Sequence, residues 1–203
     1  MPGFLVQALA SRGVSDVAEL DLSLRGLLPP FELDGVFAAA HRLSDAIKND
    51  ERILIVGDFD ADGATASAVS VSLLRAMGAK QVDFLVPNRF EFGYGLTREI
   101  VTVALERDPA VLVTVDNGIS SLAGVEAAQT AGVDVIVTDH HLPGADLPNA
   151  HAIVNPNLTG CGFASKSLAG VGVVYYVLSV LRASLREEGY FAASGIEEPN
   201  MAN

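Results

Sequence analysis

Short apolar segments recur along the chain and alternate with longer segments that have helical spacing. The apolar segments are rich in Val and Ile and lie at 52–56, 82–86, 110–115, 133–138 and 151–155. Segments of this kind are typical of strands buried on both faces of a sheet, because neither face needs a polar residue. The pattern therefore predicts a mainly parallel sheet of about five strands.

Around these segments, apolar residues recur at the intervals of an α-helix. Asp34 is the expected N-cap of the first predicted helix, whose apolar face holds Val36, Ala40, Leu43 and Ile47. The other predicted helices lie at 64–77, 96–107, 120–131 and 167–187. Helices that alternate with buried strands cover both faces of the sheet, so we expect a doubly wound α/β fold.

The chain of 203 residues is long enough for one well-cored domain with a short appendage. Residues 1–33 have the pattern of an irregular lead with one short helix, and the lead closes near Pro29 and Pro30, which break regular structure. We expect residues 34–203 to form the core domain.

Polar residues follow the predicted strands at the point where each strand ends. The first strand leads into GDFDADG (57–63), the second into Arg89, the third into DNG (116–118) and the fourth into DHH (139–141). Ligands bind doubly wound sheets outside the carboxyl ends of the strands, so these residues are expected to converge on one crevice. Taken singly, each aspartate has the alternative role of a helix cap or turn residue.

Five clustered carboxylates need cations, because without counter-charge they repel and take up protons. Oxygen ligands mixed with imidazole suit Mn²⁺ or Mg²⁺, and there are enough ligands for two ions. An EF-hand calcium loop is excluded, because its twelfth position counted from Asp58 is Val69, which cannot bind a cation.

Other phosphate-handling motifs are absent or incomplete. The chain has no G-x-x-x-x-G-K-[ST] and no G-x-G-x-x-G. The aspartyl-phosphatase pattern D-x-D-G-T is missed by one residue at Ala64, and it would give the paired histidines no role.

The net charge of −12 is unfavourable for a nucleic-acid surface, so any contact with nucleic acid is expected to use bound cations or local patches. Cys161 is the single cysteine, which rules out an intramolecular disulfide and fits a reducing compartment, with cytoplasm as the expectation. We expect no signal peptide and no membrane span.

In their order, GDFDADG, VDNG, TDHH and NPN resemble the motifs of the DHH phosphoesterases. The segments LLPPFELDG, VPNRFEFGYGL and SLAGVGVVYYVL narrow the resemblance to the family's exonucleases that are specific for single-stranded DNA. The resemblance covers roughly residues 26–190. It implies Mn²⁺- or Mg²⁺-dependent hydrolysis of DNA from a 5′ end, with release of mononucleotides.

The resemblance also implies roles for particular residues. His141 would face the scissile phosphate as a catalytic residue, Asp116 would bridge two ions, and Asp139 would orient a neighbouring imidazole. The positions that match the metal site are Asp58, Asp60, Asp62, Asp116 and His140. The expected substrate-binding residues are Arg89, Asn117 and Tyr94. For Arg89, an exposed ion pair with Glu91 or Glu99 is an equal alternative.

Members of the family continue to a further aspartate motif and a second domain, which this sequence lacks before Asn203. We therefore expect the catalytic-half core of such an exonuclease. Single-stranded DNA is the implied partner, together with single-strand-binding protein and repair helicases. Two alternatives stay open, namely a DHH enzyme for short oligonucleotides, cyclic dinucleotides or pyrophosphate, and a metal-binding module without catalytic activity.

Overall fold

The computed structural model describes residues 1–21 and 23–201, with the backbone alone for Arg89. The chain divides into two compact units, Met1–Pro29 and a second unit that begins at Pro30. The boundary falls at the Pro29-Pro30 pair, within the lead that the sequence predicts for residues 1–33. Every strand among the described residues belongs to the second unit.

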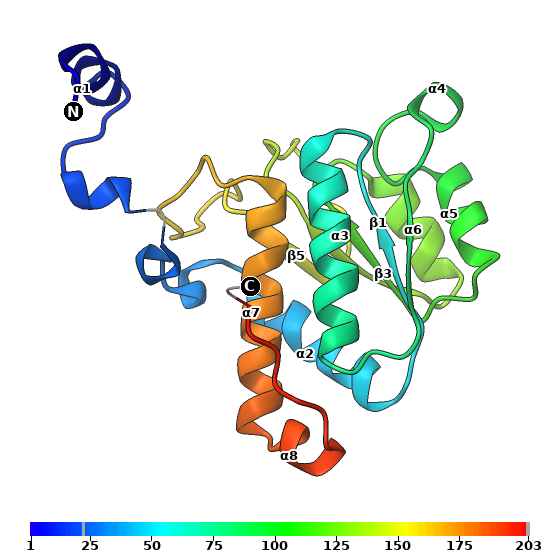
Figure 1. Cartoon of the computed structure of the whole chain (residues 1–203). Helices are drawn as coiled ribbons and strands as arrows, with labels where there is room; N and C mark the ends of the chain where they lie inside the picture. Colours follow the sequence, from blue (N-terminus) through cyan, green and yellow to red (C-terminus); the bar gives the residue numbers. More distant parts are fainter. Residues whose placement is uncertain (22, 202–203) are drawn as a thin grey trace. The chain divides into compact units, whose positions relative to one another are not determined.

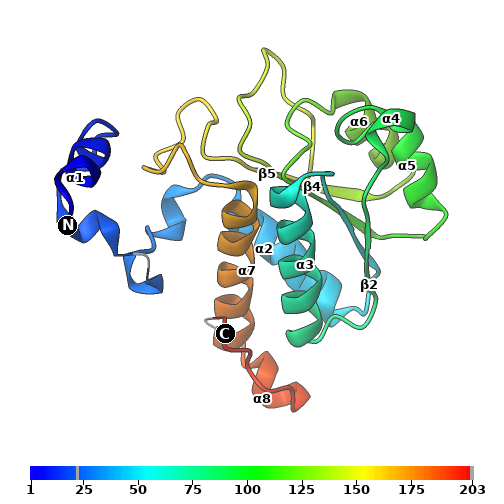
Figure 2. The same ribbon diagram turned by 45° about the horizontal axis from the view of Figure 1, so that its top comes forward.

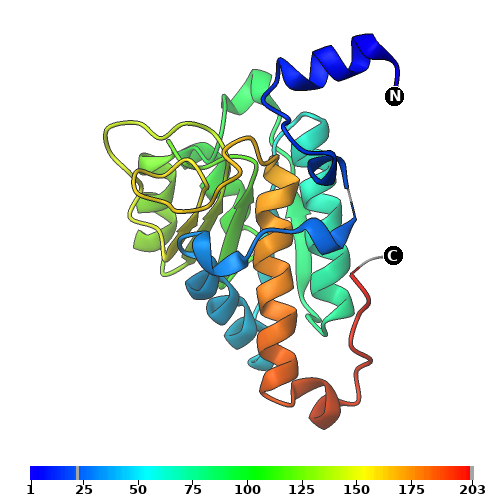
Figure 3. The same ribbon diagram turned by 90° about the vertical axis from the view of Figure 1, so that its left-hand side faces the viewer.

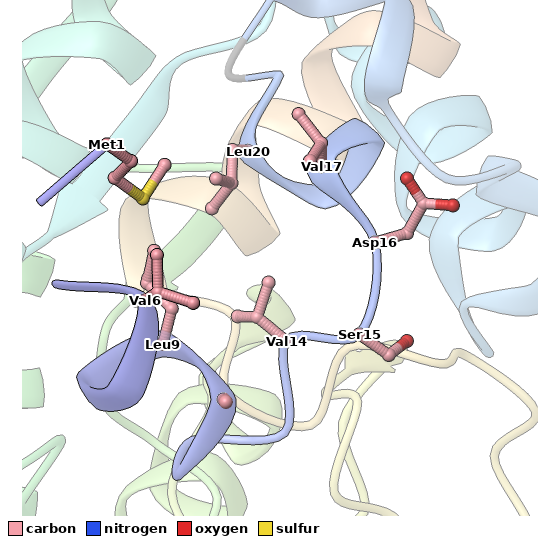
Figure 4. Close-up of a pocket in the computed structure, with 9 residues that line it drawn as sticks. Met1, Val6, Leu9, Val14, Ser15, Asp16, Val17 and Leu20 are labelled. Atoms are coloured by element: carbon pink, nitrogen blue, oxygen red, sulfur yellow. The ribbon is translucent and has the colours of Figure 1, made fainter. Parts of the chain in front are cut away.

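The first unit contains helix α1 (Gly3–Ala10) and the 3-10 helices η1 (Val17–Leu20) and η2 (Leu24–Gly26). Asp16 and Glu19 form a capping box at the start of η1. An apolar pocket of about 230 Å³ lies between α1 and η1. Figure 4 shows Val6, Leu9 and Leu20 among its lining residues.

The second unit is built on one five-stranded sheet in the order β2-β1-β3-β4-β5, and every pair of neighbouring strands is parallel (Figures 1 and 2). The strands are β1 (Ile53–Val56), β2 (Val82–Leu85), β3 (Val111–Val115), β4 (Asp134–Thr138) and β5 (Ala152–Val154). β1 and β3 are buried along their whole length, as their Val- and Ile-rich sequences predict. The predicted α/β fold is confirmed.

Helices cover both faces of this sheet. α2 (Val36–Lys48), α3 (Ala61–Ala76) and α7 (Gly170–Glu187) lie together on one face, with α7 beside α2 and α3 (Figures 1 and 3). α5 (Arg98–Leu105) and α6 (Leu122–Thr130) pack against each other and against alternate residues of β1, β3 and β4 on the other face. The short helices of this unit are η3 (Pro30–Glu32), α4 (Arg89–Phe92) and α8 (Tyr190–Ser194). No helix among the described residues is long and apolar enough to cross a membrane.

Each predicted helix start differs from the observed start by one to three residues, and two of these differences have a structural cause. The N-cap of α2 is Gly35 and not Asp34, because Gly35 lies so close to β5 that a Cβ atom would stand 2.1 Å from the carbonyl oxygen of Ile153. α3 begins at Ala61, three residues before the predicted start, because Asp60 caps it. Asp62 therefore lies in the first turn of a helix and not in a loop.

The strand order sets the position of the crevice. β1 and β3 are neighbours, and the helices that follow them, α3 and α6, lie on opposite faces of the sheet. A doubly wound sheet opens a crevice at such a switch point, outside the carboxyl ends of the two strands. The GDFDADG and DNG segments follow β1 and β3 directly, so they lie at this crevice.

Candidate metal centre

The carboxyl ends of β1, β3 and β4 bring acidic and imidazole side chains into two overlapping groups. One group comprises Asp58, Asp60 and Asp116, and the other comprises Asp116, His140 and His141. Within each group, one ligand atom from each residue lies within 4.8 Å of the others. Asp116 belongs to both groups and is therefore the centre of the cluster.

The backbone of Asp116 has an energetically unfavourable conformation. Its φ of 63° is in the left-handed region, which costs a residue with a side chain about 1–2 kcal/mol, although aspartate tolerates it better than most. The side chain is 1% exposed, and its Oδ1 atom accepts no hydrogen bond from the described residues. Burial, together with the charges of Asp62 and Asp60, raises the pKa of Asp116 to about 7.

His140 lies beside the Oδ1 atom of Asp116. Its Nε2 atom lies 3.0 Å from Asp116 Oδ1 and 3.8 Å from Asp62 Oδ2. An imidazole lone pair and carboxylate oxygens repel one another at such distances unless a proton or a cation lies between them. The arrangement is that of ligands around a shared positive charge.

Asp139 joins the DHH segment to the DNG segment. Its Oδ1 atom accepts hydrogen bonds from the backbone N–H groups of His140 and His141 and lies 2.7 Å from His141 Nδ1, while its Oδ2 atom accepts from the backbone of Ile119. Burial alone would lower the pKa of His141, but the hydrogen bond to Asp139 and the neighbouring carboxylates outweigh it and raise this pKa. Asp139 thus orients the His141 ring and favours its protonated form.

The three aspartates of GDFDADG have different local partners. Asp58 is buried and accepts a hydrogen bond from the backbone of Phe59, while Asp60 caps α3 by accepting from the backbone of Gly63. A Cβ atom at residue 63 would lie 2.6 Å from the backbone and Cβ of Asp58, so only glycine fits beneath this carboxylate. Asp62 instead accepts hydrogen bonds from the backbone of Gly170 and Val171 at the start of α7, each at 2.7 Å.

The residues predicted to bind substrate occupy different environments. Asn117 is 1% exposed, and its amide donates to the carbonyl oxygens of Val56 and Val115, so its donors join β1 to β3 and are not available to a substrate. Tyr94 is about half exposed, and its hydroxyl lies 3.4 Å from His141 Nδ1. The backbone of Arg89 begins α4, and its side chain lies outside the described part of the chain.

Two asparagines that support the histidine pair were not predicted from the sequence. Asn155 donates to the carbonyl oxygen of His141, and Asn157 donates to that of His140. Both residues belong to the NPN segment directly after β5, so their position at a strand end was the available signal.

The geometry agrees with comparisons to known proteins. The model of the DHH family, N-terminal domain, matches residues 52–198, which include every residue of both ligand groups. The chain belongs to the DHH family. Its DHH segment lies within the matched residues, with the two histidines beside the central aspartate of the cluster.

Individual relatives within the family have names that state a particular activity. The chain is 54% identical over its full length to the single-stranded-DNA-specific exonuclease RecJ of Dickeya dadantii and to that of Escherichia coli. It spans 35% of the length of each of these two relatives. Among solved structures, RecJ of Thermus thermophilus in complex with Mn²⁺ is 35% identical with a TM-score of 0.72, covering 95% of this chain and 25% of that chain.

Proposed function

We propose that this chain is the catalytic-half core of a metal-dependent exonuclease that degrades single-stranded DNA from the 5′ end and releases mononucleotides. The observation that carries the proposal is the Asp116 carboxylate, which is buried, lacks a hydrogen bond on Oδ1 from the described residues and belongs to both ligand groups. The high identity to RecJ exonucleases supports the choice of substrate.

The donor set fits two ions of Mn²⁺ or Mg²⁺. Carboxylate oxygens predominate and imidazole nitrogens are fewer, which suits Mn²⁺ and also Mg²⁺ with more water ligands. Asp58, Asp60 and Asp116 would hold one ion, and Asp116 and His140 would hold the other, with Asp62 close to His140. Structures of related RecJ proteins with Mn²⁺ and with Mg²⁺ support this choice of metals.

When bound, a pair of such ions supplies an activated water and offsets the charge that develops on the scissile phosphate. The chain's own residues then position the reacting groups. His141, held at Nδ1 by Asp139, is 47% exposed at its side chain and has a raised pKa, so it can stabilise phosphate charge or donate a proton near neutral pH. Tyr94, which lies beside His141, and Arg89 are the proposed contacts to the DNA strand.

Wider roles follow from the resemblance alone. We propose action in DNA repair and recombination in the cytoplasm, with single-strand-binding protein and repair helicases as partners. The net charge of −12 makes the bound cations important for any contact with a phosphate backbone.

The test uses the natural protein that carries this sequence, with Mn²⁺ and a single-stranded oligonucleotide labelled at its 3′ end. We expect stepwise shortening from the 5′ end with mononucleotides as products, and much slower cleavage of a blunt duplex. Digestion confined to di- and trinucleotides would instead favour a small-substrate DHH enzyme. Metal binding without turnover of any of these substrates would overturn the proposal.

A further inference from the structure

The amino end of α7 lies against the metal centre, although it is far from the DHH motifs in the sequence. Figure 1 shows α7 and α3 side by side, with the amino ends of both helices at the edge of the sheet where the strands end. Gly170 and Val171 donate their backbone N–H groups to Oδ2 and Oδ1 of Asp62, which is 108 residues away from Gly170. The first residue of α7 thus contacts one of the predicted metal ligands.

The same residue is also in contact with Asp116. A Cβ atom at residue 170 would lie 2.5 Å from Asp116 Oδ1 and 2.7 Å from Asp116 Cγ, far inside any normal contact distance. Asp116 cannot easily move away, because it is buried and its backbone N–H is bound to the carbonyl oxygen of Thr138 in β4. The absence of a side chain at residue 170 is what makes room for the central carboxylate.

α7 depends on Asp62 in return. Its own N-cap, Ala169, makes no side-chain hydrogen bond, so Asp62 supplies the acceptors that a local Ser or Asp would otherwise provide. A helix amino end carries a partial positive charge of about half a unit, which stabilises nearby carboxylates. The helix therefore partly offsets the repulsion between Asp62 and Asp116 and orients Asp62 towards His140.

We propose that Gly170 is a positioning residue of the metal centre, which brings the amino end of α7 against Asp116 and thereby sets the orientation of the Asp62 carboxylate. This inference rests on the proposed metal-dependent function and adds α7 to the elements that build the site. The carboxylate oxygens of Asp62 have further lone pairs, so hydrogen bonding to α7 is compatible with metal coordination.

The test compares Gly170→Ala with Gly172→Ala, which makes the same change in the same helix. The three atoms nearest to a Cβ atom at residue 172 would all belong to the side chain of Leu168, which can move. We expect Gly170→Ala to weaken Mn²⁺ binding about tenfold or more in calorimetry and to alter the EPR spectrum of bound Mn²⁺. Gly172→Ala should leave both close to those of the unaltered chain, and the metal-free proteins should have similar circular dichroism.

A measurement on the unaltered chain covers the case in which Gly170→Ala does not fold. On titration with Mg²⁺, the amide NMR signals of Gly170 and Val171 should shift more than that of Gly172. Equal Mn²⁺ binding by the two variants, or Gly170 and Val171 signals that do not respond to Mg²⁺, would overturn the inference and leave the proposed function intact. Failure of the unaltered chain to bind Mn²⁺ would overturn the proposed function, and this inference with it.

Discussion

Both ends of the sheet carry acidic side chains, but the groups that neutralise these carboxylates differ between the two ends. At the amino ends of the strands, Arg42 lies 2.7 Å from Glu51 and 2.6 Å from Asp134, so one guanidinium is paired with two carboxylates. Arg107 pairs with Asp83 at 2.9 Å in the same region. Basic side chains thus neutralise carboxylates at this end.

At the carboxyl ends, the neutralising groups are of another kind. Within the described residues, Asp62, Asp116 and Asp139 form no ion pair with Arg or Lys, and their close neighbours are backbone N–H groups and the imidazoles of the DHH segment. Backbone dipoles and imidazoles offset a cluster of carboxylates only in part. The difference indicates that basic side chains complete the charge balance at the amino ends, while Asp62, Asp116 and Asp139 at the carboxyl ends are arranged to receive cations.

The largest expected effect comes from Asp116→Asn. Asparagine tolerates the left-handed conformation at φ 63° and keeps the shape of the side chain, but it is a poor ligand for a hard cation. We expect loss of calorimetrically detectable Mn²⁺ binding and of exonuclease activity, with the fold retained in circular dichroism. An Asp116→Asn protein that still degrades single strands would contradict the role of this end of the sheet.

Asp139→Asn should have the next largest effect. The amide can replace only one of the two carboxylate oxygens, so either Ile119 or the His141 segment loses its acceptor. We expect a fall in activity of about 10- to 100-fold with a smaller loss of Mn²⁺ affinity, because His141 is no longer oriented.

The pKa of His141 in Asp139→Asn shows whether the loss of activity comes from the missing Asp139–His141 hydrogen bond or from damage to the fold. Without the Asp139 carboxylate, this pKa should fall, which an NMR titration of the imidazole measures directly. An unchanged pKa of His141 in Asp139→Asn would mean that the hydrogen bond does not set its protonation.

The stability of the metal-free chain should depend on pH through Asp116. Its pKa is raised in the folded chain from 3.8 to about 7, so between these values the folded chain binds more protons than the unfolded chain. The stabilisation from protonated Asp116 is therefore full below about pH 4 and is lost as the pH rises to about 7.

The measurement is the unfolding temperature of the metal-free chain across this pH range, with Asp116→Asn as the control. As the pH rises, the unfolding temperature of the unaltered chain should fall relative to that of the variant. Parallel curves for the two proteins would show that Asp116 keeps its ordinary pKa.

The smallest effect is expected at the other end of the sheet, from Asp134→Asn. This change removes one of the two partners of Arg42 at a half-exposed position, and it should cost about 1 kcal/mol of unfolding free energy or less in urea denaturation. Mn²⁺ binding should be unaltered. A loss of Mn²⁺ affinity comparable to that of Asp139→Asn would remove the distinction between the two ends.

Local sequence predicted most of the fold, because each strand and helix has a periodicity that depends on its own residues. The same reasoning placed Asp58, Asp116 and His140 together, since parallel strands end at one edge. It missed Gly35 as the N-cap of α2, because that position is set by the approach of Ile153 in β5.

The remaining features of the site depend on contacts that the sequence does not show. Asn117 stays a predicted substrate contact, and the sequence does not show that its amide nitrogen donates to the carbonyl oxygen of Val56, 61 positions earlier. The roles of Asp62 and Gly170 arise only when α7 is packed against α3. Local patterns identify which residues reach the crevice, while tertiary packing decides which way each side chain points.

The most direct test of the shared metal centre is anomalous diffraction from crystals of this chain grown with Mn²⁺. We expect two Mn²⁺ peaks on either side of the Asp116 carboxylate, one beside Asp58 and Asp60 and the other beside His140. A single peak, or peaks at positions that leave Asp116 uncoordinated, would contradict the account.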